Sequence, residues 1–134
     1  MAPPPKLHGR AFYNSIGAPK HVLAPMVDQS EFAWRLLTRS FLPADLRTSI
    51  LAYSPMLHPK MFADSPKYRA AHFEALKEDG EAYLDGNPAF DRPLIVQFCA
   101  NDPECLLEAA KQVQGYCDAV DLNLGCPQGI AKRG

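Results

Sequence analysis

The segment Asp121–Pro127, with the sequence Asp-Leu-Asn-Leu-Gly-Cys-Pro, contains the side chains best suited to chemistry in this chain. It predicts a strand that leads into a tight turn carrying the thiol of Cys126. Gly125 and Pro127 flank this thiol, and both residue types have special backbone conformations. Cys126 could therefore be a nucleophile, a proton donor or a small buried hydrophobe. A free thiol is mostly protonated at neutral pH, which suits an acid.

Asp121 and Asn123 are expected on one face of this strand, because successive side chains point to opposite faces. Val120, Leu122 and Leu124 would occupy the other face and pack under helices. The Asn123 carboxamide offers two donors and an acceptor, which suit a ligand amide or a uracil-like edge. An equally simple interpretation is that Asn123 caps the turn that follows.

Gln97 lies within the apolar run Leu94–Phe98, so its carboxamide needs hydrogen-bond partners. A flavin ring edge or a neighbouring strand would supply them. Gln97 and Asn123 would both point inward if their strands are neighbours. Met26, directly after Pro25, could lie against a planar cofactor through its polarisable sulfur or could belong to the core.

Four predicted strands position these residues, at 21–26, 49–54, 94–99 and 119–124. Helical patterns follow the first three strands, and this alternation predicts an α/β fold with a parallel sheet. A doubly wound sheet and a TIM (β/α)8 barrel both fit this order. A barrel needs ~250 residues, so this chain would be the N-terminal half of one. The polar residues finish or follow the strands, and the carboxyl ends of parallel strands hold the active site in such folds.

The helices carry more detailed expectations. Ser30 is expected to cap the first helix, and Pro66 to open a helical stretch that ends near Asp79. Pro55 is expected to end the second strand, and Pro103 to open the third helix. The expected apolar side of the first helix comprises Phe32, Trp34, Leu36, Leu37 and Phe41. The expected core contacts after Pro66 are Tyr68, Ala71, Phe73 and Leu76, and those after Pro103 are Leu106, Leu107, Ala110 and Val113.

The composition of 134 residues, with 47% hydrophobic and 22% charged residues, is that of a folded domain. The net charge of -1 gives no basic excess for nucleic-acid binding, and no apolar run approaches the ~18 residues of a membrane span. The four cysteines form no CxxC pair, so we expect no metal site and a reducing compartment. Residues 1–11 are expected to be a disordered, proline-rich tail rather than a transit peptide, and residues 12–134 the folded part. We therefore expect a cytoplasmic or nuclear protein rather than a mitochondrial one.

Four blocks of this sequence resemble the tRNA-dihydrouridine synthases in their order and spacing. They are Val22–Ser30, Tyr53–Met56, Leu94–Phe98 and Asp121–Pro127. The resemblance runs from about Phe12 to the end, and it is to the eukaryotic branch that acts on uridines 16 and 17 of the tRNA D-loop. The Asn-x-Gly-Cys-Pro block together with an upstream Ala-Pro-Met is specific.

This resemblance implies an FMN-dependent TIM barrel followed by a helical tRNA-binding domain. By motif, Pro25, Met26 and Val27 would line the flavin and Gln97 would hydrogen-bond it. Asn123 would lie on the substrate side, and Cys126 would be the catalytic acid. NADPH or NADH would reduce FMN, which would deliver hydride to C6 of a flipped-out uracil, while C5 would take a proton from Cys126.

The resemblance also implies that much of the site lies outside this chain. The lysine and histidine that bind flavin and its phosphate, and most tRNA contacts, would follow Gly134. The chain alone would then form a half-barrel that binds FMN poorly and has no activity. Two alternatives stay open: a flavoenzyme like dihydropyrimidine or dihydroorotate dehydrogenase, and an inactive truncated product. Gly125 before the cysteine favours the tRNA enzyme over the first.

Overall fold

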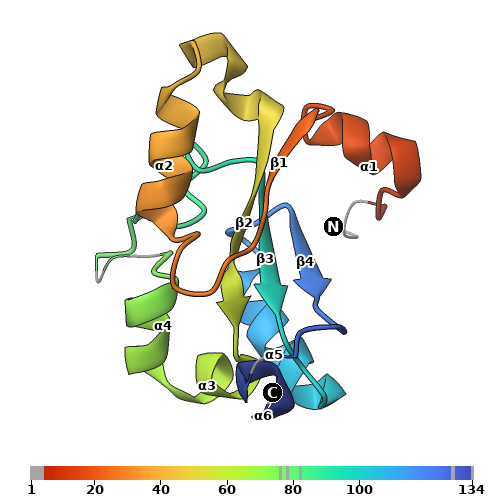
Figure 1. Cartoon of the computed structure of the whole chain (residues 1–134), viewed down its shortest axis with the longest axis vertical. Coiled ribbons are helices and arrows are strands. Elements are labelled where there is room, and N and C mark those ends of the chain that lie inside the picture. Colours follow the sequence, from red (N-terminus) through yellow and green to blue (C-terminus); the bar gives the residue numbers. More distant parts are fainter. Residues whose placement is uncertain (1–4, 76, 78, 82, 128, 134) are drawn as a thin grey trace.

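A parallel four-stranded sheet forms the centre of this computed structural model, which describes all residues except 1–4, 76, 78, 82, 128 and 134. The strands are β1 (His21–Leu23), β2 (Ile50–Leu57), β3 (Leu94–Phe98) and β4 (Ala119–Leu122). They lie side by side in the order β1-β2-β3-β4 (Figure 1). A doubly wound sheet reverses its strand order at a switch point, whereas a barrel does not. The α/β prediction is confirmed, and the strand order is that of one side of a barrel.

Helices connect the strands and flank the sheet. They are α1 (Gly9–Ser15), α2 (Phe32–Ser40), the 3-10 helix η1 (Ala44–Ser49), α3 (Pro59–Asp64), α4 (Pro66–His72), α5 (Pro103–Val113) and α6 (Gly129–Arg133). A proline stands at the start of α3, α4 and α5, where its missing N–H costs no hydrogen bond. Asp102 caps α5, since its Oδ1 accepts from the backbone N–H of Glu104 at 2.8 Å. In the described part of the chain, none of the helices is long and apolar enough to cross a membrane.

The hydrophobic core lies between one face of the sheet and helices α3 and α5. Phe62 of α3 packs edge-on against Phe98 of β3, with ring centroids 5.4 Å apart, and against Phe73 at 6.3 Å. The other members are Ala52, Leu57, Leu94, Val96, Ala109 and Val113. The expected core positions of Phe73 and Val113 are confirmed, whereas Ala71 and Leu107 are exposed and Leu76 lies outside the described residues.

The second strand does not end at Pro55, as the sequence had indicated. It continues to Leu57 through a bulge, so that Tyr53 pairs with Ile95 and Met56 with Gln97. The Ser54 hydroxyl takes the place of a backbone acceptor, since its Oγ accepts from the Gln97 N–H at 3.0 Å. A bulge removes proline from the regular ladder, which is why the strand can include it.

Other element boundaries also differ from the predictions. Strands β1 and β4 end at Leu23 and Leu122, before the residues expected at their ends. Helix α4 ends at His72 rather than near residue 79, and α3 was not predicted. Helix α1 takes in residues 9–11 of the expected tail, and residues 1–4 lie outside the described part. The domain boundary near residue 12 stays a prediction.

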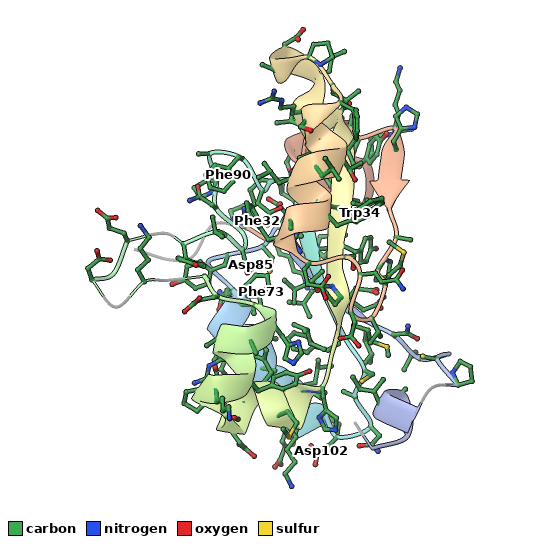
Figure 2. The ribbon with its side chains drawn as sticks, turned by 60° about the vertical axis from the view of Figure 1, so that its left-hand side comes forward. Phe32, Trp34, Phe73, Asp85, Phe90 and Asp102 are labelled. Carbon is green, nitrogen blue, oxygen red and sulfur yellow. The ribbon has the colours of Figure 1, made fainter. Side chains whose placement is uncertain are left out.

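The buried side of α2 is charged, which contradicts the sequence prediction. Arg35 and Arg39 are its buried residues, whereas Trp34, Leu36, Leu37 and Phe41 are exposed. Phe32 alone of the expected apolar side packs closely, with its ring 5.6 Å from that of Phe90. Figure 2 shows Phe32, Phe90 and Asp85 on one side of α2 and Trp34 on the other.

Four charged residues form a group at the amino ends of β2 and β3, here called the Asp91 cluster: the buried Arg35, Arg39 and Asp91, and the partly buried Asp85. Asp91 accepts from Arg35 Nε at 3.0 Å, Arg35 Nη2 at 2.6 Å and Arg39 Nη1 at 2.8 Å. Arg35 also donates to Asp85 at 2.8 Å, and Arg39 to the Pro93 carbonyl at 2.8 Å. Burial alone would lower the pKa of Arg35, but its bonds to Asp91 and Asp85 more than offset this and raise it.

Candidate functional site

A pocket of about 350 Å³ lies at the carboxyl ends of the strands. The loop after β1 contributes one side of it, and β2, β3 and the turn after β4 contribute the rest. Its lining residues are Pro25, Met26, Val27, Gln29, Met56, Gln97, Asn123 and Cys126. The structure therefore brings together in one pocket all six residues that the sequence analysis selected. Their roles stay predictions.

Gln97 and Asn123 contact each other across the pocket wall because β3 and β4 are neighbours. Asn123 Nδ2 donates to Gln97 Oε1 at 3.4 Å, and Gln97 Nε2 donates to Asp121 Oδ2 at 2.7 Å. Asn123 Oδ1 accepts from the Gly125 N–H at 3.0 Å, so this side chain also caps the turn. The two interpretations of Asn123 are thus compatible, since one end of its amide holds the turn and the other faces Gln97.

The loop that carries Pro25, Met26 and Val27 is held by Ser30. The Met26 N–H donates to Ser30 Oγ at 2.9 Å, and the same hydroxyl donates to the Met26 carbonyl at 3.1 Å. Ser30 therefore does not cap α2 as predicted: the cap residue is Glu31, without a side-chain bond. The Ser30 carbonyl in turn accepts from Arg35 Nη1 at 2.8 Å. The Asp91 cluster thus fixes the far end of the loop that forms the pocket.

Cys126 is the thiol of this pocket, and it is half-buried. Cys99 lies nearby but is buried, and its Sγ donates to the Leu57 carbonyl at 3.5 Å. Burial raises the pKa of Cys99, and the neighbouring Cys126 adds to this effect. Cys126 is accordingly the cysteine that a ligand in the pocket can meet.

Asp121, Met56 and Gln29 take part in the site but were not selected as site residues. Asp121 had been placed on the same strand face as Asn123, and this alternation was the signal for it. Met56 stood in the Tyr53–Met56 block of the resemblance, which was the signal for it, but it was given no role. Burial raises the pKa of the Tyr53 phenol, and the Asp121 carboxylate adds to this effect.

A second cavity, of about 520 Å³, lies at the opposite end of the sheet between α2 and the 88–93 segment. Its charged lining includes Arg39, which binds Asp91, and Arg92, which pairs with Asp118 at 3.2 Å. Each of these two arginines has a carboxylate partner within the chain, although Arg39 Nε and Arg92 Nε have no hydrogen-bond partner among the described residues. We place the chemistry in the smaller pocket because it contains the residues that the sequence analysis selected. Among the described residues, no group of three His, Cys, Asp or Glu side chains could hold a metal ion.

A parallel sheet with the strand order of a barrel, and with a polar pocket at its carboxyl edge, is typical of α/β barrel proteins that bind a ligand. Comparison with known families identifies it further, because the dihydrouridine synthase (Dus) model matches residues 22–134. The chain belongs to the dihydrouridine synthase family, and it is an N-terminal part of the TIM barrel of that family. The family resemblance and the fold class predicted from the sequence are both confirmed.

Curated relatives agree with this assignment. The tRNA-dihydrouridine(16/17) synthase [NAD(P)(+)] of Saccharomyces cerevisiae is 58% identical over 129 residues, which are 96% of this chain and 27% of that protein. A tRNA-dihydrouridine(16/17) synthase-like protein of Rattus norvegicus is 52% identical over 97% of this chain and 26% of its own length. A human tRNA-dihydrouridine(20a/20b) synthase-like protein is 37% identical over 80% of this chain and 28% of its own length. The chain thus spans about a quarter of these relatives, and no solved structure matches it significantly.

Proposed function

We propose that this chain forms the flavin-facing and acid-bearing part of a tRNA-dihydrouridine synthase acting at positions 16 and 17 of the D-loop. The observation that carries the proposal is the single pocket that joins Gln97, Asn123 and Cys126 in a chain of this family. The complete protein would reduce uridine to 5,6-dihydrouridine with NADPH or NADH as reductant. Its location would be cytoplasmic or nuclear.

The lining of the pocket suits the ring of FMN. Met26 and Met56 offer polarisable apolar surface, and the carboxamides of Gln97 and Asn123 offer hydrogen bonds at its rim. Among the described residues that line the pocket there is no lysine or arginine, so the phosphate of FMN would need other cationic partners. When bound, FMN would supply hydride to C6 of the uracil.

Cys126 would act as the acid at C5 of the same base. Cys126 follows Gly125 in the turn and lines the pocket. A protonated thiol can donate its proton without a metal or a second base. Asn123 would hold an edge of the uracil beside it. A stacked uracil is not accessible on both faces, so the target base would leave the tRNA stack to enter.

The tRNA itself would be bound mainly by parts of the protein outside this chain. The net charge of -1 supplies little attraction for a phosphate backbone. The 134-residue chain alone would therefore bind FMN poorly and have no activity. A stoichiometric flavin absorbance in the purified 134-residue chain would contradict this part of the proposal.

The acid assignment is tested by Cys126→Ala in a protein extended to the length of the relatives. We expect normal FMN binding and normal reduction of the flavin by NADPH, with loss of at least ~100-fold in dihydrouridine formation in unmodified tRNA. Cys105→Ala removes another half-buried thiol, on α5. This variant is the matched control and should keep full activity. Dihydrouridine formation by Cys126→Ala at the normal rate would refute the assignment. Faster reduction of free uracil than of tRNA would favour a dihydropyrimidine dehydrogenase-like enzyme.

A further inference from the structure

Asp121 begins a chain of hydrogen bonds that runs in one direction along the pocket wall. An ionised carboxylate can only accept hydrogen bonds, so the group that Gln97 turns toward Asp121 must be its NH2. The Gln97 carbonyl oxygen then points to Asn123, whose own NH2 donates to it. Asn123 is left with its carbonyl oxygen on the turn, where the Gly125 N–H donates to it.

Both ends of this chain fix its direction. Turning the Gln97 amide over would place its oxygen 2.7 Å from a carboxylate oxygen, and turning Asn123 over would place its NH2 against the Gly125 N–H. Either change replaces an attraction with a repulsion and leaves a part-buried polar group unpaired. The main chain fixes one end, and Asp121 alone fixes the other.

The fixed direction of this chain determines which N–H groups of Gln97 and Asn123 remain unused. Each carboxamide has two N–H groups, and the described contacts use one of each. The remaining N–H groups belong to side chains that line the pocket between Met26 and Met56. This combination of N–H donors beside a soft apolar surface fits a flat ring whose edge carries carbonyl oxygens.

We propose that Asp121 is a positioning residue that sets the polarity of the pocket by orienting Gln97 and Asn123 as hydrogen-bond donors to ring carbonyl oxygens. The ligand class rests on the proposed function, where the isoalloxazine ring of FMN and the uracil of tRNA both carry such carbonyls. Asp121 touches neither ring in this proposal; it acts through Gln97.

The test uses two variants of the protein extended to the length of its relatives. Asp121→Asn keeps the shape but lets the Gln97 amide adopt either orientation. The double variant Asp121→Asn with Gln97→Glu exchanges the two groups, so that a hydrogen bond between positions 97 and 121 persists while the pocket loses the N–H of residue 97. Asp118→Asn is the control, since Asp118 lies at the amino end of β4 and accepts from the Leu94 N–H at 2.7 Å.

FMN affinity and the reduction potential of bound FMN are measured without tRNA, and uridine reduction is measured separately. We expect Asp121→Asn to weaken FMN binding about 5- to 10-fold, the equivalent of about one hydrogen bond, and to shift the potential. The exchanged pair should bind FMN more weakly still, while Asp118→Asn leaves affinity and potential unchanged. Wild-type FMN affinity together with wild-type uridine reduction in the exchanged pair would overturn the proposal, because neither ring would then need a donor at position 97. A loss confined to uridine reduction would place the donors on the uracil.

A ligand-independent readout separates this inference from the proposed function. The side-chain amide of Gln97, identified in ¹⁵N-glutamine-labelled protein by its absence in Gln97→Glu, should shift in Asp121→Asn and not in Asp118→Asn. This holds even if the wild-type protein forms no dihydrouridine, an outcome that would refute the proposed function alone. An unchanged Gln97 amide resonance in Asp121→Asn would refute the positioning role, whatever the protein catalyses.

Discussion

The two ends of the parallel sheet use polar side chains in opposite ways. At the amino end, the Asp91 cluster joins two buried arginines to two carboxylates, and every carboxylate oxygen of Asp91 accepts at least one bond. At the carboxyl end, Gln97 and Asn123 keep one N–H each beyond their described contacts. The first arrangement satisfies both carboxylate oxygens of Asp91 within the chain and leaves only Arg39 Nε of its described side-chain nitrogens without a partner, whereas the second leaves donors at the wall of a pocket for a ligand.

This difference agrees with the division of labour in barrels of this kind, where one end of the strands provides stability and the other the reaction. The two ends are also connected. Arg35 donates to both Asp91 and the Ser30 carbonyl, and Ser30 holds the Met26 backbone. The stable end therefore anchors the loop that forms the pocket.

The largest expected effect comes from opening the Asp91 cluster. Asp91→Asn leaves Arg39 buried with a neutral partner and Arg35 with Asp85 as its one remaining carboxylate, and losing one partner of a buried ion pair costs about 3–5 kcal/mol of unfolding free energy. Denaturant unfolding of the full-length protein measures this cost. Asp121→Asn, which removes the same charge at the carboxyl end, should cost about 1 kcal/mol. Equal losses in the two variants would remove the distinction between the ends.

The turn that leads into the cluster gives the next largest effect. Gly86 has a φ of +70°, its N–H donates to Asp91 Oδ2 at 2.9 Å, and a Cβ there would collide with the Tyr116 carbonyl. Gly86→Ala should therefore cost about 3 kcal/mol, since both the positive φ and the collision oppose it. Gly80→Ala is the matched control, because Gly80 has a φ of +83° with nothing within 4 Å, and it should cost only about 1 kcal/mol. Similar melting temperatures for the two variants would show that the turn can move.

The sequence predicted the carboxyl end better than the amino end. Strand alternation is local, so Asp121 and Asn123 could be assigned to one face of their strand from the sequence. Gln97 joined them on the condition that the two strands are neighbours, and the structure meets this condition. The family motif then joined them to Met26 and Cys126. The pocket was predictable because each of its elements is a strand end, and parallel strands bring their ends together.

The Asp91 cluster was not predictable in this way. The counter-charge of Arg35 lies 56 residues away and that of Arg39 lies 52 residues away. Only the apolar side of α2 was therefore named from the sequence, and no prediction was made for its two arginines. The wrong side of α2 was thus chosen as its buried side. Buried arginines need partners, and only the tertiary structure supplies them. The bulge at Ser54 was missed for a related reason, because its acceptor role depends on β3.

The smallest expected effect compares the thiols at the two ends of β4. Both thiols are half-buried, and burial raises the pKa of Cys117, just before the strand, from 9.0 to about 11, whereas Cys126 lines the pocket after the strand. Because the thiolate is the form that alkylates, iodoacetamide at pH 8 should label Cys126 well before Cys117, as read by mass spectrometry of digested protein. A pKa raised by folding stabilises the protein below the unfolded value, so the contribution of Cys117 should be lost as the pH rises from 9.0 through about 11. Cys117→Ala should make the free energy of unfolding less dependent on pH over that range, and it should leave the pH dependence between pH 7 and 8 unchanged. Equal labelling of the two thiols at pH 8 would show that the amino end of β4 is as accessible as the pocket.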